Sequence, residues 1–201
     1  TLGELRRNAG LRALLGIGSE AQVPKAWNVS RFLEVLGQEP HRTHLREMFD
    51  GMVRTLGVAV PDLGQNTAGD STALHARAKS DAQAVAAETA AGLAQPAAGR
   101  KEYTNEEGNV TKVVAWFGYK LHLLVDARHE VTLAYQTTAA NAADGPTLPA
   151  LVQQAQANLP AGRIETLAYD KAADDGAVHQ KLAAAGIRPV IENRRLWKEE
   201  W

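Results

Sequence analysis

Two short runs in the second half of the chain alternate apolar and polar side chains with a period of two. They occupy residues 119–125 and 131–137, and a turn-prone segment, 126–130, separates them. Alternation with this period is typical of β-strands, and two such runs joined by a short turn predict an antiparallel hairpin. This hairpin constrains the fold more than any other feature of the sequence.

The elements expected around the hairpin alternate between helix and strand. Helices are predicted at 148–159 and around Val178 and Leu182, and strands at 164–169, at 187–191 and near 67–74. Strands that alternate with helices after a hairpin predict an α/β fold, with a sheet of mixed direction and helices packed on it.

The first 57 residues are expected to be mostly helical. Apolar residues recur at helical spacing from Leu45, and Gly57 is expected to end that helix. A shorter helix is predicted to begin at a cap formed by Asn28 or Ser30 and to end at Gly37. Residues 58–65 form a turn-rich connection, and residues 75–112 are interpreted as a loop or insertion with a short Ala-rich helix near 81–91.

Composition excludes several classes of protein. The 201 residues include no cysteine, so thiolate metal sites and cysteine nucleophiles are excluded, and the net charge of −1 provides no general attraction to nucleic acid. Only residues 1–60 are net basic, with eight Lys and Arg against six Asp and Glu. The chain has no apolar run long enough to span a bilayer and no secretory leader, which predicts a cytoplasmic protein without membrane contact. Both ends are expected to be cuts through a longer protein.

Two aspartates, Asp70 and Asp170, stand at the polar edge of short strand-like segments. A carboxylate at the edge of a rigid sheet can bind a divalent cation, and two from adjacent strands can share one Mg²⁺. Alternatively, each aspartate caps the turn or helix that follows it. The spacing alone leaves both interpretations open.

Four sequence blocks resemble, in their order and spacing, the bacterial insertion-sequence transposases of the DDE type. They lie at 69–74, 117–126, 138–144 and 167–174, and the segment from Val23 to Leu36 resembles what those transposases carry ahead of the catalytic domain. One departure is visible, because Ala172-Ala173-Asp174 stands where the family commonly has Gly-Tyr-Asp.

The resemblance implies a ribonuclease-H-like fold, an α/β fold with a mixed sheet and flanking helices, preceded by a small helical region. Asp70 and Asp170 would be the first two members of an Asp-Asp-Glu triad. The third member is expected on a later helix beyond this chain, since the downstream glutamates are poor matches to its position: Glu192, Glu199 and Glu200. Residues 1–60 would then contribute DNA contact or dimerisation, and residues 61–201 would be a partial catalytic domain with the insertion near 75–112.

The implied activity is metal-dependent cleavage and strand transfer at insertion-sequence ends, with Mg²⁺ or Mn²⁺ as cofactor. The implied partners are double-stranded DNA, both transposon ends and target, and a second copy of the chain, in the bacterial cytoplasm and at the nucleoid. Basic residues near the sheet edges are expected to hold the DNA backbone, although each also fits an ordinary solvated charge. They are Lys120, Lys171, Arg188 and the favoured pair Arg194 and Arg195.

Other side chains are weaker candidates. His122 faces away from its apolar neighbours, and a solvated or hydrogen-bonded histidine is favoured over a metal ligand there. His75 follows Asp70 closely, His41 and His44 lack a third ligand nearby, and Trp116 is best explained by packing.

Two rival interpretations remain at this level. The chain could be an inactive DNA-binding or dimerisation fragment of a transposase, or another ribonuclease-H-like nuclease. A catalytic site requires the carboxylates of Asp70 and Asp170 to lie within about 4–7 Å of each other, because both must reach one cation.

Overall fold

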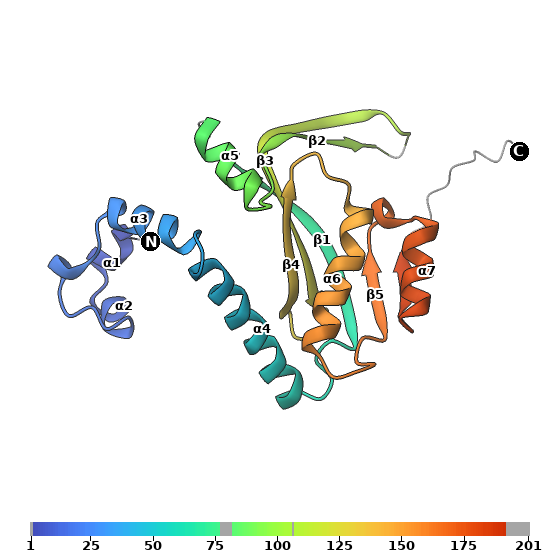
Figure 1. Ribbon diagram of the computed structural model, residues 1–201, viewed down its shortest axis with the longest axis horizontal. Coiled ribbons are helices and arrows are strands. Elements are labelled where there is room, and N and C mark those ends of the chain that lie inside the picture. The colour runs from blue at the N-terminus through green and yellow to red at the C-terminus, as the bar shows by residue number, and fades with distance from the viewer. Residues whose placement is uncertain (1, 77–81, 106, 192–201) are drawn as a thin grey trace, which may run out of the picture. The chain divides into compact units, whose positions relative to one another are not determined.

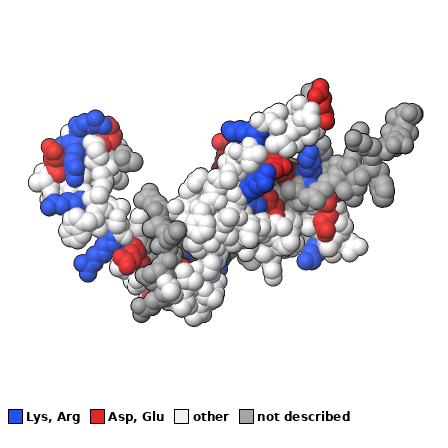
Figure 2. Space-filling model, turned by 90° about the horizontal axis from the view of Figure 1, so that it is seen from above, with Lys and Arg blue, Asp and Glu red and all other residues white. Residues whose placement is uncertain are grey.

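The computed structural model describes residues 2–76, 82–105 and 107–191 (Figure 1). Contacts divide the chain into two units, Thr1–Met52 and Val53–Trp201. Within the described residues, no helix is both long and apolar enough to cross a membrane. Acidic and basic side chains are mixed over the surface, in agreement with the small net charge (Figure 2).

The first unit is helical, as predicted. It contains α1 (Leu2–Arg7), α2 (Ala9–Leu14), the short 3₁₀ turn η1 (Glu20–Gln22), α3 (Ala26–Leu36) and the beginning of α4 (His41–Ala59). The predicted cap of α3 is wrong: the helix begins at Ala26, and the Asn28 side chain accepts a hydrogen bond from the Lys25 N–H at 3.2 Å. The end of this helix at Gly37 is confirmed.

Helix α4 continues beyond the glycine that was expected to end it. Gly57 is buried inside the helix, and a Cβ at this position would lie 2.9 Å from Cδ2 of Leu159. Glycine therefore serves close packing here, not termination. The helix ends two residues later, where Arg163 donates hydrogen bonds to the carbonyl groups of Gly57, Val60 and Leu63.

The second unit is built on one mixed sheet. Its strands are β1 (Asn66–His75), β2 (Ala97–Thr104), β3 (Val110–Asp126), β4 (Thr132–Ala139), β5 (Thr166–Tyr169) and β6 (Arg188–Ile191). They lie in the order β2-β3-β1-β5-β6, and β4 pairs with β3. The β3–β4 hairpin is antiparallel, as predicted, whereas β1, β5 and β6 are parallel to one another.

Helices α6 (Asp144–Asn158) and α7 (Gly176–Ala184) complete this unit. Helix α6 packs on β3 and β4, and α7 contacts α6 (Figure 1). The core between helices and sheet is aliphatic, and its fully buried members include Leu124, Leu133, Leu148, Leu151 and Leu167. This is the mixed sheet with flanking helices expected of a ribonuclease-H-like protein.

The segment at 75–112 is more ordered than predicted. The short helix is present as α5 (Ala82–Ala90), but the expected loop after it is strand β2, which pairs with the beginning of β3. Strand β2 carries few large apolar side chains, and both faces of the hairpin are largely exposed. Periodicity of hydrophobic residues therefore could not reveal it.

Candidate active site

Parallel pairing of β1 with β5 brings the two candidate aspartates close in register. The last pair of this ladder joins Ala68 to Ala168; β1 continues through Asp70, whereas β5 ends at Tyr169, one residue before Asp170. Side chains alternate along a strand, so Asp70 lies on the same face of β1 as Ala68, and Asp170 comes two residues after Ala168, the partner of Ala68. Both side chains are exposed.

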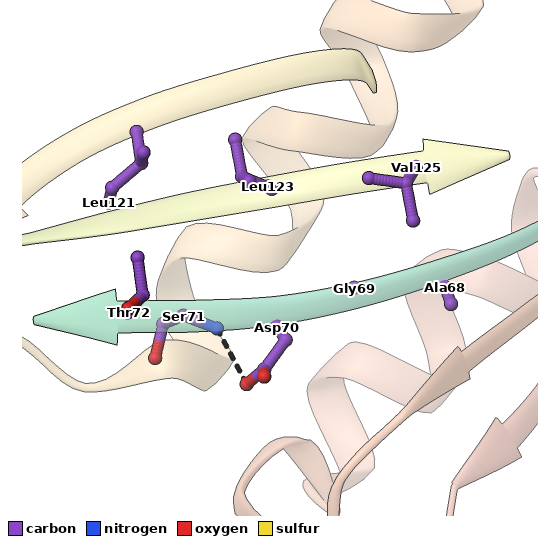
Figure 3. Close-up of a pocket in the computed structure, with 8 residues that line it drawn as sticks. All are labelled: Ala68, Gly69, Asp70, Ser71, Thr72, Leu121, Leu123 and Val125. Carbon is purple, nitrogen blue, oxygen red and sulfur yellow. Dashed lines mark hydrogen bonds between the residues drawn. The ribbon is translucent and has the colours of Figure 1, made fainter. Parts of the chain in front are cut away.

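Asp70 lies inside β1 and not at its end, which differs from the prediction of a strand edge. It stands just beyond the residues that pair with β5, while β3 still pairs with β1 on the other side. One carboxylate oxygen, Oδ1, accepts a hydrogen bond from the N–H of Ser71 at 2.7 Å (Figure 3). This bond orients the carboxylate and leaves its other oxygen for a ligand.

A shallow apolar cavity of about 190 Å³ adjoins Asp70 on this face. Its walls come from β1 and β3, and Leu121, Leu123 and Val125 of β3 line it (Figure 3). The register explains this lining, since Asp70 stands opposite Leu123 across the antiparallel ladder. The exposed carboxylate is thus bordered by hydrocarbon on one side.

Tyr169 lies behind the two aspartates, on the opposite face of the sheet. Its ring covers Gly69, where a Cβ would approach the ring carbons to 2.5 Å. The hydroxyl is buried, and the described residues offer it no hydrogen-bond partner. Burial raises the pKa of this hydroxyl, and the negative charges of Asp144, Asp170 and Asp70 raise it further. Tyr169 is therefore a neutral support beneath the acidic pair.

Lys120 is hydrogen-bonded to other groups of the protein, on the side of the sheet that α6 covers. Its ammonium donates to Oδ1 of Asp144 at 3.1 Å and to the carbonyl of Ala142 at 2.8 Å. Asp144 stands in the first turn of α6, where the helix dipole favours a negative charge. This ion pair ties the loop before α6 to β3, and DNA contact by Lys120 stays a prediction.

His122 is completely buried next to this pair. Nε2 of His122 forms a hydrogen bond with the hydroxyl of Thr138, which lies 2.8 Å away. Its other nitrogen, Nδ1, lies 3.5 Å from Oδ1 of Asp144 without a hydrogen bond. Burial lowers the pKa of His122, partly opposed by Asp144. The favoured hydrogen-bonded histidine is thus correct, although the side chain is not solvated.

The remaining candidates are dispersed. Lys171 follows Asp170 directly, in the 3₁₀ turn η2 (Lys171–Ala173), and is exposed. Trp116 is a packing residue, as predicted: it is buried and donates through Nε1 to the carbonyl of Tyr119. Five residues named in the sequence analysis lie outside the described residues: Glu192, Arg194, Arg195, Glu199 and Glu200.

The predicted histidine candidates do not assemble a metal site. His75 is exposed at the end of β1, and the rings of His41 and His44 contact each other edge to face. Within the described parts of the chain, no group of three or more His, Cys, Asp or Glu side chains is arranged to hold a metal ion. Oδ1 of Asp174 lies 3.0 Å from Nε2 of His179 and pairs with that ring.

Sequence reasoning missed two residues that lie behind this site, on the other face of the sheet, Asp144 and Tyr169. Both lie inside blocks that carry the family resemblance, at 138–144 and 167–174, so a signal for them was present. Only the fold reveals that they come together, because α6 and β5 are needed to place them on the same side of the sheet.

Comparison with known proteins gives a family and a set of distant structural likenesses. The family model described as "Transposase DDE domain" matches residues 68–199. No curated protein matches the chain.

The solved structures it is similar to include the Mos1 mariner paired-end complex with Mn, at 14% identity and a TM-score of 0.36, covering 90% of this chain and 57% of that one. A pre-cleavage Mos1 transpososome is similar at 13% identity and a TM-score of 0.35, covering 95% and 57%. The chain thus spans little more than half the length of these solved chains. At such TM-scores, the family model alone carries the assignment.

Proposed function

Because the chain belongs to the DDE transposase family, we propose that it contains the catalytic carboxylates of an insertion-sequence transposase, which cleaves and transfers DNA strands with a divalent metal ion. The observation that supports this proposal is the β1–β5 register, in which Ala68 pairs with Ala168 and each partner stands two residues before one of the aspartates. These residues are separated by a hundred positions in the sequence, and a purely structural role in capping would not require them to be neighbours.

The chemistry of the two side chains suits Mg²⁺ or Mn²⁺. Carboxylate oxygens are the preferred ligands of these hard cations, and Asp70 and Asp170 would supply two of the three carboxylates of an Asp-Asp-Glu set. When bound, the metal supplies activation of an attacking hydroxyl and stabilisation of the leaving oxygen of a phosphodiester. The Ser71 N–H holds the Asp70 carboxylate in place, and Lys171 places a positive charge next to Asp170, where a phosphate would lie.

The proposed partner is double-stranded DNA, at transposon ends and at the target. Residues 1–60 are proposed to contribute DNA contact or formation of a homodimer, since they carry the net basic part of the chain. Arg194 and Arg195 are proposed to contact the DNA backbone as well. The setting proposed for this activity is the bacterial cytoplasm, with association to the nucleoid when the protein is bound to DNA.

Metal binding tests the proposed site directly. Calorimetric titration of the full chain with Mn²⁺ is expected to show binding that weakens at least tenfold in Asp70→Asn and in Asp170→Asn, since each change removes a charged oxygen ligand. Glu165→Gln is the matched control, because Glu165 is an exposed carboxylate just ahead of β5. Equal Mn²⁺ affinity in all four proteins would exclude Asp70 and Asp170 as metal ligands.

A DNA-binding fragment without catalysis is the alternative function. It is favoured by the finding that the described residues contain no group of three potential metal ligands. Nicking of supercoiled plasmid in the presence of Mn²⁺ separates the two. Nicking that disappears in Asp70→Asn supports the catalytic proposal, whereas DNA binding without any nicking supports the alternative.

A further inference from the structure

The distal part of the β2–β3 hairpin, residues 101–104 and 110–114, extends away from the main sheet and is called the arm (Figure 1). In this part of β3 the only pairing partner among the described strands is β2, whereas residues from Gly118 onward pair with β1 and β4. An isolated two-stranded ribbon is at best marginally stable in water. The arm therefore has more to gain from a binding partner than any other part of the sheet.

One face of the arm carries two lysines around a tyrosine. Tyr103 stands opposite Lys112 across the ladder, and Lys101 lies two residues before Tyr103, so the three side chains share a face. The ammonium groups of Lys101 and Lys112 lie 5.6 Å and 5.7 Å from the centre of the Tyr103 ring. Both distances are within the range of cation–π attraction.

The charges of the two faces differ. Arg100 forms an ion pair with Glu102 on the opposite face, so that positive charge is neutralised. On the face with Lys101, Tyr103 and Lys112, the described residues of the arm include no acidic side chain. Two ammonium groups that share one aromatic ring repel each other, and an anion bound across them relieves that repulsion. Basic side chains are visible along the arm in Figure 2.

We propose that this lysine–tyrosine face of the arm binds the phosphate backbone of duplex DNA. The inference rests on the proposed function, in which the protein binds DNA, and assigns part of that binding to a surface remote from Asp70 and Asp170. The turn of the arm carries Glu107, whose carboxylate accepts a hydrogen bond from the Asn109 amide. A negative tip opposes insertion of the arm end-on, so the face lies along the backbone and reads no bases.

Salt dependence of binding tests this assignment. Affinity of the full chain for a duplex of about 30 base pairs is measured by fluorescence anisotropy over a series of KCl concentrations. The double variant Lys101→Gln/Lys112→Gln is expected to bind roughly tenfold or more weakly at about 0.1 M salt, and its log–log salt slope is expected to be smaller by about two, since two phosphate contacts are lost. Circular dichroism melts confirm that the exposed substitutions leave the fold intact.

The matched control is Arg100→Gln/Lys181→Gln, which removes the same charge from the opposite face of the arm and from α7. Its salt slope is expected to stay at the wild-type value. Equal losses in both double variants would overturn the assignment, because only net charge would then matter. A larger effect of Lys101→Gln/Lys112→Gln on an RNA duplex than on DNA would also overturn it.

The same experiment distinguishes failure of the proposed function from failure of the arm assignment. If the wild-type chain binds no duplex DNA at low salt, DNA binding itself fails and the arm assignment fails with it. If the wild-type chain binds DNA and Lys101→Gln/Lys112→Gln binds equally well with the same slope, only the arm assignment fails.

Discussion

The two halves of strand β3 belong to one continuous strand and yet have opposite surroundings. Residues from Gly118 to Asp126 pair with β1 on one side and β4 on the other, and His122 and Leu124 are completely buried there. Residues from Val110 to Phe117 pair with β2, and Val110, Val113 and Phe117 are each about half exposed. The same backbone conformation thus serves a core at one end and a surface at the other.

This contrast indicates that the number of neighbouring strands, more than strand propensity, decides what a position contributes to stability. In the inner half, every second side chain is enclosed between the sheet and α6. In the outer half, both faces meet water, and charged or aromatic side chains are tolerated on either of them. The inner half lies beside Asp70, and the outer half includes residues 110–114 of the arm.

The largest effect is expected at the junction of the halves, for Gly118→Ala. Gly118 has a φ of 153°, and a Cβ at this position would lie 2.1 Å from the carbonyl oxygen of Leu74. The backbone of β1 cannot move away without losing its pairing, so we expect a loss of more than about 4 kcal/mol in the free energy of unfolding. Urea denaturation followed by circular dichroism measures it.

Gly108→Ala is the matched control for this prediction. Gly108 also has a positive φ, of 83°, but it lies in the turn of the arm, and nothing would come within 4 Å of its Cβ. We expect a cost of about 1–2 kcal/mol, from the conformation alone. Similar costs at the two glycines would show that the junction is not a crowded point.

A smaller effect is expected within the halves themselves. Leu124→Ala removes a side chain that is 0% exposed, and a loss of about 2–5 kcal/mol is expected from the lost burial and the cavity left behind. Val113→Ala, at 46% exposure, is expected to cost less than about 0.5 kcal/mol. Comparable losses in the two variants, measured by urea denaturation, would contradict the contrast between the halves.

The smallest expected effect is a pH dependence of stability that arises from His122, in the inner half of β3. Burial lowers the pKa of His122 below its ordinary value of 6.5, while Asp144 and Lys120 face it with opposite effects. The unfolded chain therefore binds a proton more readily than the folded one, and stability falls as the pH drops below about 6.5. We expect the stability of His122→Gln to change less between pH 7.5 and pH 5.

His75→Gln is the control for the pH experiment, because His75 is exposed at the end of β1. Its variant is expected to keep the wild-type dependence on pH. An identical decline in His122→Gln and the wild type, measured as the urea midpoint at each pH, would mean that burial of His122 does not contribute.

Much of the second unit was predictable because hydrophobic residues recur along its strands and helices with the spacing typical of each. The β3–β4 hairpin, α6, α7 and the short strands β5 and β6 appear where periodicity indicated them. The arm was missed, since a two-sided exposed hairpin lacks hydrophobic alternation. The end of α4 was misplaced, because Gly57 was interpreted by its usual role at helix ends and not by its contact with Leu159.

Most local elements, and the residue types suited to metal binding, follow from the sequence alone, since both depend on neighbours a few positions apart and on side-chain type. Tertiary structure decided which of those residues meet. The ladder between β1 and β5 pairs Ala68 with Ala168, each two residues before a candidate aspartate, and Lys120 reaches Asp144 across 24 positions. Such contacts depend on which strands pair and in what register, and a shift by one residue would turn every side chain to the other face. No local pattern in the chain carries that information.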